Sequence, residues 1–411
     1  MEASLKLGNG DWGVKNDSLL AYDDFGGKFR PLPFDFTRAS SATVVNKQGL
    51  IETVQSGIPR IDFNNDAKGA LLLEPQSTNL VTYSEDFSNA SWQKNNVSIV
   101  SNEITSPDGT LNADKFIPST SNSNHRITNS VNGTQNLAVT LSVYAKADGY
   151  NFLRITENGS TGDYATFNLL DGIVENNTSS EAKIESVGNG WYRCSSSIVA
   201  TTSHRFDIYV MESATIQEPW QGNGTSGVYI YGAQLEQNSF STSYIPTTQG
   251  AISTRLADIA TNSGNASLIN SEEGTIYGEQ KSLETNFTYN YFASVSDGTT
   301  NNRLEIRQAG TSLQFLWRVG GTYQGAITLS NAPFSSIIKY AVSYSSTDIA
   351  FYVNGSLVGT IDTPTLYSLG TLNNLELADG GGALNFRGKT KSLQVYKTAL
   401  TDAQLTLLTT I

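Results

Sequence analysis

The stretch IAFYVNGSLVGTI, residues 349–361, carries the clearest structural signal in this sequence of 411 residues. Two apolar runs flank Asn354-Gly355, a dipeptide that accepts positive φ at both central positions of a two-residue turn. The stretch therefore predicts a tight β-hairpin with a type I′ turn. Similar short strands separated by Gly, Asn and Asp continue from it in both directions along the chain.

Two series of such strands can be recognised on either side of a polar segment. The first occupies 76–250 and includes GWYRCSSSIVAT (190–201) and SGVYIYGAQLEQ (226–237). The second occupies 268–411, and residues 251–267 between the two series are predicted to be a linker. Evenly spaced short strands with turn residues between them are typical of antiparallel jelly-roll sandwiches.

The composition agrees with a β fold. Hydrophobic residues make up 38% and charged residues only 16%, and the chain has 36 Gly against 10 Pro. Small polar residues suit the outward faces of strands, and Gly suits their turns. One short helix is predicted near the end, where Thr401 and Gln404 have capping-box spacing and Ala403, Leu407 and Leu408 would form the buried face.

The first 75 residues differ from the rest, because they are polar and contain few long apolar runs. The stretch FDFTRASSATVVNKQGLIETVQSGIPRIDF (34–63) alternates apolar and polar residues around a turn at residues 46–49. A segment of this kind cannot bury enough apolar area to be stable alone. Residues 1–75 are therefore predicted to be an attachment and oligomerisation segment.

The predicted fold class is all-β, with two antiparallel jelly-roll sandwiches in tandem behind a small N-terminal β attachment segment. The expected boundaries are 1–75 for that segment, 76–250 for the first sandwich, 251–267 for the linker and 268–411 for the second sandwich.

The charge and the absence of several signals exclude some classes of function. A net charge of −12 repels phosphate backbones and anionic membranes, so no nucleic-acid partner is expected. No apolar run reaches the 18 residues of a membrane span, so no membrane insertion is expected. MEASLKLGNGDWG lacks the features of a secretory signal, and the single cysteine, Cys194, excludes an internal disulfide.

Residues arranged for catalysis are hard to find. The two histidines, His125 and His204, have no zinc-binding spacing, and Cys194 lies in an alternating strand where inert burial is expected. ADGGGALNF (378–386) lacks the Lys-Ser/Thr of a phosphate loop and is interpreted as a turn. The acids of 268–411 never take the Glu-x-Asp-x-x-Glu spacing of glucanases, which leaves open only a carboxylate pair from separate strands. No enzyme activity is expected.

Sugar binding is the more plausible chemistry, because it needs an exposed aromatic ring beside Asp, Asn, Gln or Arg. Trp220 in QEPWQGNG and Tyr323 in GGTYQG lie in turn-rich surroundings, and Trp92 in SNASWQKN is also loop-like. These three are the candidate ligand-binding residues, whereas Trp191 and Tyr244 are interpreted as packing residues. No metal site or cofactor is expected: Asp-Gly turns such as 108–109 offer oxygen ligands for Ca²⁺, but turn formation explains them fully.

Three stretches resemble known families. FDFTRASSATVVNKQGLIETV (34–54), with PRIDF (59–63) and LLLEPQSTNLVTYSEDFSNASW (71–92), resembles a module of tailed-bacteriophage virion proteins, often tail or head fibre components. VYIYGAQLEQNSFSTSYIPT (228–247) is similar to the closing strand of a carbohydrate-binding-module-like jelly roll. AFYVNGSLVGT and FRGKTKSLQVYKTALTDAQL (386–405) resemble laminin-G/concanavalin-A-like lectin domains. Where many such domains carry an acidic residue after the glycine equivalent to Gly388, Lys389 follows here, which counts against a calcium site at that position.

The resemblance implies a fibre or spike protein located in the virion and assembled in the cytoplasm of a host bacterium. Its lectin-like domains would adhere to host-surface polysaccharide. Residues 1–75 would contact other virion proteins, and the chain would form a homo-oligomer, with a trimer expected for such fibres. The alternatives are a purely structural capsid or tail decoration protein without a ligand and, less favoured, a polysaccharide depolymerase.

Overall fold

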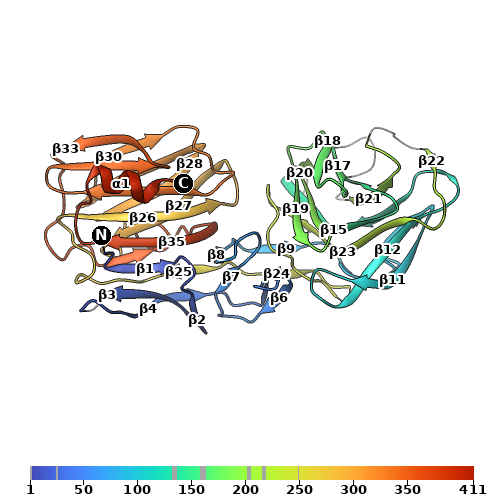
Figure 1. The fold of residues 1–411 in the computed structure, drawn as a ribbon, viewed down its shortest axis with the longest axis horizontal. Coiled ribbons are helices and arrows are strands. Elements are labelled where there is room, and N and C mark those ends of the chain that lie inside the picture. Colours follow the sequence, from blue (N-terminus) through green and yellow to red (C-terminus); the bar gives the residue numbers. More distant parts are fainter. Residues whose placement is uncertain are drawn as a thin grey trace. The chain divides into compact units, whose positions relative to one another are not determined.

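The computed structural model describes residues 2–24, 26–131, 137–157, 163–200, 205–214, 219–248 and 250–411. The chain forms two compact units, of which unit 1 comprises 1–41, 54–75 and 256–411 and unit 2 comprises 42–53 and 76–255. Both units are built from antiparallel strands (Figure 1). In the part of the chain that the structure describes, no helix has the length and apolar character needed to cross a membrane.

The larger sheet of unit 1 has the strand order β25-β4-β3-β1-β35-β26-β31-β32-β33. Three more strands pair outside this order: β8 with β35, β7 with β8, and β2 with β3. Its strands are β1 (Leu5–Gly8), β2 (Gly13–Lys15), β3 (Ser18–Asp24), β4 (Phe29–Thr37), β7 (Arg60–Asp62), β8 (Ala70–Leu73), β25 (Ile259–Thr261), β26 (Gly274–Ser282), β31 (Ile338–Tyr344), β32 (Asp348–Val353), β33 (Ser356–Asp362) and β35 (Gly388–Tyr396).

A second sheet of unit 1 has the order β30-β29-β28-β27-β34. Its strands are β27 (Phe287–Ser296), β28 (Arg303–Gly310), β29 (Ser312–Val319), β30 (Thr322–Leu329) and β34 (Asn374–Glu376). Apolar side chains of both sheets form one buried core, in which the rings of Phe315 and Phe351 lie 6.3 Å apart. Unit 1 is therefore a two-layer β-sandwich.

The predicted hairpin is confirmed. Strands β32 and β33 pair with each other, and Asn354 and Gly355 have φ angles of 49° and 81° at the turn. The predicted helix also exists as α1 (Asp402–Thr409), where the Thr401 backbone N–H donates to Gln404 Oε1 at 2.9 Å.

The predicted buried face of this helix is wrong. Ala403 and Leu407 are exposed, Leu408 is half-buried, and the fully buried positions are Leu405 and Thr409. Leu405 packs into a cluster that contains three tyrosines of the larger sheet, Tyr277, Tyr352 and Tyr396. The position of these rings, which come from distant strands, determines which side of the helix is buried.

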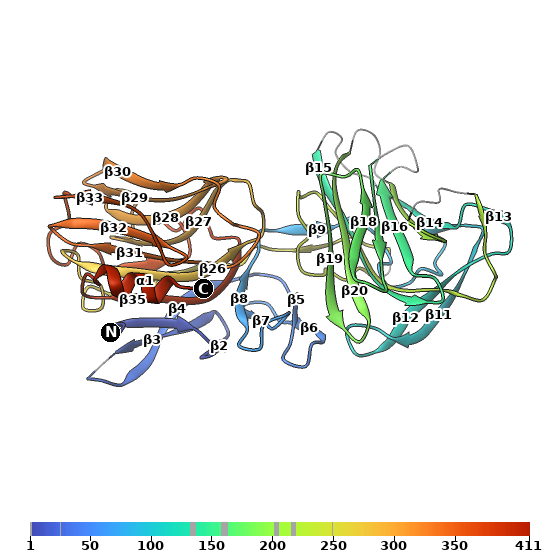
Figure 2. The ribbon, with the colours of Figure 1, turned by 45° about the horizontal axis from the view of Figure 1, so that its top comes forward.

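Unit 2 is a second sandwich of two six-stranded sheets, with the orders β10-β14-β21-β16-β17-β18 and β11-β12-β23-β15-β20-β19 (Figure 2). Its strands are β10 (Trp92–Asn95), β11 (Val97–Thr105), β12 (Leu111–Pro118), β14 (Arg126–Ser130), β15 (Leu137–Asp148), β16 (Phe152–Glu157), β17 (Tyr164–Asn168), β18 (Ile173–Asn177), β19 (Glu181–Gly188), β20 (Trp191–Ala200), β21 (Arg205–Met211) and β23 (Gly227–Glu236). The short pairs are β5 (Ala42–Val45) with β6 (Ile51–Val54), β9 (Ser77–Asn79) with β24 (Ser253–Arg255), and β13 (Asn122–Ser123) with β22 (Trp220–Gln221). The all-β fold class with antiparallel jelly-roll sandwiches is thus confirmed.

The structure groups the N-terminal residues differently from the predicted boundaries. Strands β1 and β8 both pair with β35, with Leu5 opposite Val395 and Leu71 opposite Thr390. Lys389 forms an ion pair with Asp62 at 2.5 Å. Most of the first 75 residues therefore complete the sheet of the C-terminal sandwich, because they lack a core of their own.

The polar hairpin at 42–53 and the predicted linker are also part of folded units. Ile51 of the hairpin packs in unit 2 with Tyr144 and Trp191. The predicted linker contributes β24 to unit 2 and β25 to unit 1. The chain consequently passes between the two units at 41/42, 53/54, 75/76 and 255/256 rather than through one free linker.

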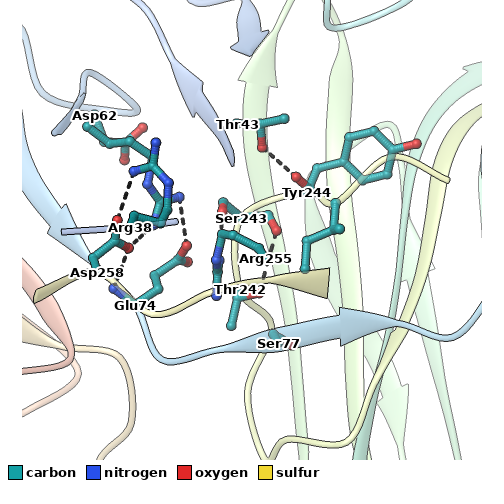
Figure 3. A network of polar contacts seen from close by, with 12 residues as sticks. Arg38, Thr43, Asp62, Glu74, Ser77, Thr242, Ser243, Tyr244, Arg255 and Asp258 are labelled. Atoms are coloured by element: carbon teal, nitrogen blue, oxygen red, sulfur yellow. Dashed lines mark hydrogen bonds and ion pairs between the residues drawn. The ribbon is translucent and has the colours of Figure 1, made fainter. Parts of the chain in front are cut away.

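A buried ionic cluster lies in unit 1 close to these crossings (Figure 3). Arg38 Nη1 contacts Asp258 Oδ1 at 2.9 Å, and Arg60 pairs with Asp258 and, at 2.8 Å, with Glu74. The backbone N–H of Glu74 donates to Asp258 Oδ2 at 3.0 Å, and Arg38 Nη2 donates to the carbonyl of Gln55 at 2.7 Å. One carboxylate thus joins three chain segments at the points where they leave unit 1.

In unit 2, separate hydrogen bonds hold the same chain segments where they enter that unit. The Thr43 hydroxyl donates to the Tyr244 carbonyl at 2.5 Å, and Arg255 Nη1 donates to Ser243 Oγ at 3.0 Å (Figure 3). The buried carboxylate of Glu236 accepts from Ser77 Oγ at 2.6 Å. Tyr244 is buried, as predicted, and its hydroxyl reaches Glu85 Oε1 at 2.9 Å.

Candidate functional site

The outer face of the five-stranded sheet of unit 1 is polar and contains arginines. Side chains of a strand alternate between its two faces. Along β28, Leu304 and Ile306 enter the core, so Arg303, Glu305 and Arg307 lie on the opposite face. Charged residues at every second position of one strand are unusual in a chain with so few charges, and they mark this face as a candidate site.

Residues that lie opposite each other in an antiparallel sheet share a face, so the strand register defines three rows across it. The rows are Tyr323-Arg318-Arg303-Ser296-Asn374, Ala326-Leu316-Glu305-Ser294-Glu376 and Thr328-Gln314-Arg307-Tyr291. They run from the edge strand β30 towards β34. The face therefore carries three guanidinium groups and two aromatic rings among small polar side chains.

Glu305 holds the centre of this face. Its carboxylate is fully buried and lies 2.5 Å from Arg303 Nε and 3.4 Å from Arg307 Nη1. Burial raises the pKa of Glu305, and the two arginines oppose that rise. The Arg307 guanidinium also stacks 4.6 Å from the ring centroid of Tyr289, which is 49% exposed. These contacts fix both arginines in position before any ligand binds.

The edge of the face presents an aromatic ring beside an unneutralised cation. Tyr323 is 53% exposed, and the guanidinium carbon of Arg318 lies 5.8 Å from its ring centroid. Arg318 Nη1 donates to the carbonyl of Gly321 at 3.1 Å. Among the residues that the structure describes, no carboxylate forms an ion pair with Arg318. Most donors of this guanidinium are thus available to a ligand.

Glu376 lies at the other end of the middle row and is 2% exposed. Burial raises its pKa from 4.5 to about 7, and the nearby carboxylate of Asp379 adds to the rise. Asn374 Nδ2 donates to Glu376 Oε1 at 2.5 Å, and this hydrogen bond lowers the pKa of Glu376 and so limits the rise. This carboxyl is therefore partly protonated near neutral pH.

The glycine-rich stretch 378–386 is a turn beside this face, as predicted. Asp379 Oδ1 accepts hydrogen bonds from the backbone N–H groups of Ala383 at 2.8 Å and Leu384 at 3.2 Å. A Cβ atom on Gly380 would lie 2.7 Å from Arg303 Cδ and 2.9 Å from the backbone oxygen of Thr299, so a larger residue there would push the loop away from Arg303. Gly380 thus allows the loop to pack closely on this arginine.

The structure brings two carboxyl groups from separate strands onto this one face. Glu305 and Glu376 lie on either side of Ser294, on β28 and β34. Both are buried, and Glu305 is neutralised by its two arginines. Because glycoside hydrolysis needs two carboxyls in contact with the sugar, this arrangement suits ligand binding better than hydrolysis.

Two of the three predicted ligand-binding residues do not have the exposure that was expected. Trp220 is 3% exposed, and its ring lies 4.6 Å from that of His125. Trp92 is fully buried, 5.0 Å from the ring of Phe87. Both lie in short strands of unit 2 that turn the indoles into its core, despite their turn-rich sequence surroundings.

Tyr323 has the predicted exposure, and the structure adds the arginines that sequence reasoning missed. The alternation Arg303-x-Glu305-x-Arg307 in the sequence could have indicated a charged face on this strand. Cys194 is buried as expected, and burial raises the pKa of its thiol. His204 lies outside the described residues.

A two-layer antiparallel sandwich with a polar, aromatic outer sheet face defines a lectin-like β-sandwich. Residues 258–406 of unit 1 match the family model described as the concanavalin A-like lectin/glucanases superfamily. No curated protein matches this chain.

Several solved structures are similar to parts of the chain. The CBM40 domain of a Ruminococcus gnavus sialidase, bound to α2,3-sialyllactose, is 19% identical and covers 36% of this chain and 93% of its own, with a TM-score of 0.31. Domain 4 of a GH43 arabinanase from Geobacillus stearothermophilus, in complex with arabinotriose, is 15% identical over 42% of this chain and 83% of its own, with a TM-score of 0.31. Domains LG4-5 of the mouse laminin α1 chain are 11% identical over 69% of this chain and 90% of their own, with a TM-score of 0.25.

Proposed function

We propose that this chain is a non-enzymatic adhesion component of a tailed-bacteriophage virion, and that the outer face of its five-stranded sheet binds acidic polysaccharide of the host surface. The observation that carries the binding proposal is the pairing of the exposed Tyr323 ring with Arg318, which lacks a carboxylate partner among the described residues. The family match of residues 258–406 supports a lectin-like role.

The chemistry of the face favours a sugar that carries a carboxylate. An exposed tyrosine ring offers an apolar surface to the C–H face of a pyranose, with its hydroxyl at the rim. A guanidinium donates two parallel hydrogen bonds to a carboxylate, and such charge-assisted bonds are stronger than neutral ones. Arg318 beside Tyr323 can therefore hold the carboxylate while the ring stacks on the same sugar.

The virion location rests on the resemblance of the stretches within residues 34–92 and not on the site. We infer that unit 1 and unit 2 are parts of a fibre or spike, that other virion proteins contact the N-terminal residues, and that the chain assembles as a homotrimer. The second candidate function is a decoration protein without a ligand. The burial of Trp92 and Trp220, which removes two expected sugar platforms, favours that alternative.

The first test changes Tyr323 and Arg318 in the full-length protein and measures binding to a uronic-acid-containing polysaccharide by calorimetry. Tyr323→Ala is expected to weaken binding about fivefold or more, because it removes about 1 kcal/mol of aromatic contact. Arg318→Gln is expected to weaken it by tenfold or more and to flatten its salt dependence, because it removes a charge-assisted hydrogen bond.

Leu357→Ala provides the matched control, since Leu357 is similarly exposed, at 50%, on a strand of the other sheet. It is expected to leave the affinity unchanged. If host cells and extracted polysaccharide fail to bind the folded protein, the decoration function gains support. If the polysaccharide binds equally well to all three variants, the site lies elsewhere.

A further inference from the structure

A groove lies on unit 1, away from the five-stranded sheet. It has a volume of about 680 Å³ and is lined by residues of β1, β3, β4 and β35 and by the turn that follows β1. A groove of this volume falls in the range of sites for small ligands, roughly 300–1,000 Å³. Most of its lining comes from residues 3–29, which precede the family-matched region.

The strand register shows which face of the larger sheet carries the groove. Lys6 lies opposite both Tyr22 and Gln394, so these three side chains share one face. Leu5 and Leu7, their neighbours along β1, are buried in the sandwich core on the opposite face. The groove is thus on the outer face of the larger sheet, on the far side of the core from the candidate site described above.

Trp12 provides a fixed aromatic wall. Its Nε1 donates to the carbonyl of Lys68 at 2.8 Å. Its ring packs on Gly8, which has a φ of +82°, and a Cβ atom there would lie 2.8 Å from Trp12 Cη2. An aromatic ring that is already held in place loses little conformational entropy when a ligand stacks on it.

Trp12 also differs from the other tryptophans in its exposure. The sequence has five, and the structure leaves Trp12 half-buried and exposed to the groove. The other four are 0–3% exposed: Trp92, Trp191, Trp220 and Trp317. A ligand in the groove would therefore contact the most exposed of the five indoles.

The polar groups of the groove include both donors and acceptors and have no net charge. Lys6 Nζ lies 4.1 Å from the ring centroid of Phe29, and Asp11 supplies the one carboxylate of the lining. The Tyr22 hydroxyl has no hydrogen bond, and Lys6 no ion pair, within the residues that the structure describes. Gln394 Oε1 accepts from the Tyr396 hydroxyl at 2.7 Å, and Gln394 Nε2 donates to Ser392 Oγ at 3.2 Å. These two contacts hold the amide in place and leave its second N–H for a ligand.

We propose that this groove is a second saccharide-binding site and that it takes a neutral sugar. Sugar hydroxyls both donate and accept hydrogen bonds. In the groove Lys6 can donate, the Asp11 carboxylate can accept, and the Tyr22 hydroxyl and the Gln394 amide can do both. The indole of Trp12 offers the apolar surface for the pyranose ring. One ammonium and one carboxylate give a charged ligand no net attraction, in contrast to Arg318 on the other face, which has no carboxylate partner in the described part of the chain.

The test uses the tryptophan fluorescence of the full-length protein, titrated with maltose, cellobiose, lactose and N,N′-diacetylchitobiose up to about 10 mM, ten times a Kd of 1 mM. At least one of these disaccharides is expected to give a saturable change in fluorescence, because Trp12 is the accessible indole. Calorimetry on the same pair gives the affinity. Trp12→Ala is expected to weaken it at least tenfold.

Tyr22→Phe removes only a hydroxyl that has no partner among the described residues, so it keeps the fold and is expected to weaken binding about threefold or more. Leu357→Ala is the matched control, because Leu357 is 50% exposed, lies on β33 outside the groove lining and is expected to leave disaccharide binding unchanged. The proposal is overturned if none of the four disaccharides gives a saturable signal, or if the affinity is the same in the wild type, Trp12→Ala and Tyr22→Phe.

The two sites can fail independently. Trp12→Ala is expected to bind the uronic-acid-containing polysaccharide as well as the wild type does. Disaccharide binding that is lost in Tyr323→Ala but kept in Trp12→Ala would assign the neutral sugar to the five-stranded sheet and overturn the groove proposal.

Discussion

Replacing Asp258 with asparagine is expected to destabilise unit 1 by about 3–5 kcal/mol, the usual cost of removing one partner from a buried ion pair. Asp258, Arg38 and Arg60 have fully buried side chains, and the Glu74 side chain is 3% exposed. Asparagine keeps the shape of the side chain but loses its charge. Arg38 would then lose its ion pair with Asp258, and Arg60 would keep the carboxylate of Glu74 but lose that of Asp258.

The effect should be confined to unit 1, because every residue of this cluster belongs to it. Differential scanning calorimetry is expected to show the transition of unit 1 lowered by about 10 °C, at 2–4 °C per kcal/mol for a unit of this size, with the transition of unit 2 unchanged. Hydrogen exchange should quicken near Arg38, Gln55 and Glu74, where chain segments leave the unit.

Arg30→Gln is the matched control for this prediction. Arg30 Nε lies 2.7 Å from Asp23 Oδ1, but the Arg30 side chain is 56% exposed, so its loss is expected to cost no more than about 1 kcal/mol. Equal melting temperatures for Asp258→Asn and Arg30→Gln would show that the buried cluster does not stabilise the unit.

The parts of the fold that sequence predicted are those encoded locally. The Asn354-Gly355 hairpin and the Thr401 cap depend on a few adjacent residues, and both are present. The role of the N-terminal residues depends instead on the pairing of Leu5 with Val395, which are far apart in the sequence. The ionic cluster around Asp258 likewise joins residues from three distant segments, so no periodicity or composition signals it.

The same contrast applies to the candidate site. The turn-rich sequence around Tyr323 correctly predicted an exposed ring. Similar sequences around Trp92 and Trp220 predicted exposure wrongly, because the direction of a side chain on a short strand depends on what that strand packs against. The arginine row required the register of β28 and β29 to be known. Within the sequence alone, only the alternating charges of β28 indicated this charged face.

Glu376→Gln is expected to stabilise the protein at alkaline pH and to have little effect in acid. Burial raises the pKa of Glu376 from 4.5 to about 7. Because the folded-state pKa lies above the unfolded one, the stability that the protonated carboxyl contributes is complete below pH 4.5 and is lost as the pH rises through 7. Glutamine is neutral at every pH and escapes this loss, so the variant should gain about 2–3 kcal/mol relative to the wild type between pH 5 and pH 8.

Urea unfolding of both proteins from pH 4.5 to pH 8.5 measures this difference. The pH dependence that comes from other groups, Glu305 among them, is common to both proteins and cancels in the comparison. Glu272→Gln is the control, because Glu272 is exposed. Parallel stability curves for wild type and Glu376→Gln would contradict the prediction.

The protonation of Glu376 also bears on ligand binding, because this carboxyl shares a sheet face with Arg303. A proton taken up as the pH falls through 7 removes a negative charge from the face that we propose for acidic polysaccharide. Binding is therefore expected to strengthen about two- to threefold from pH 8 to pH 6 at low ionic strength, where charges on one face are least screened. Glu376→Gln should bind with the stronger affinity at both pH values. If Glu376→Gln keeps the same pH dependence of binding as the wild type, that dependence comes from another group on the face.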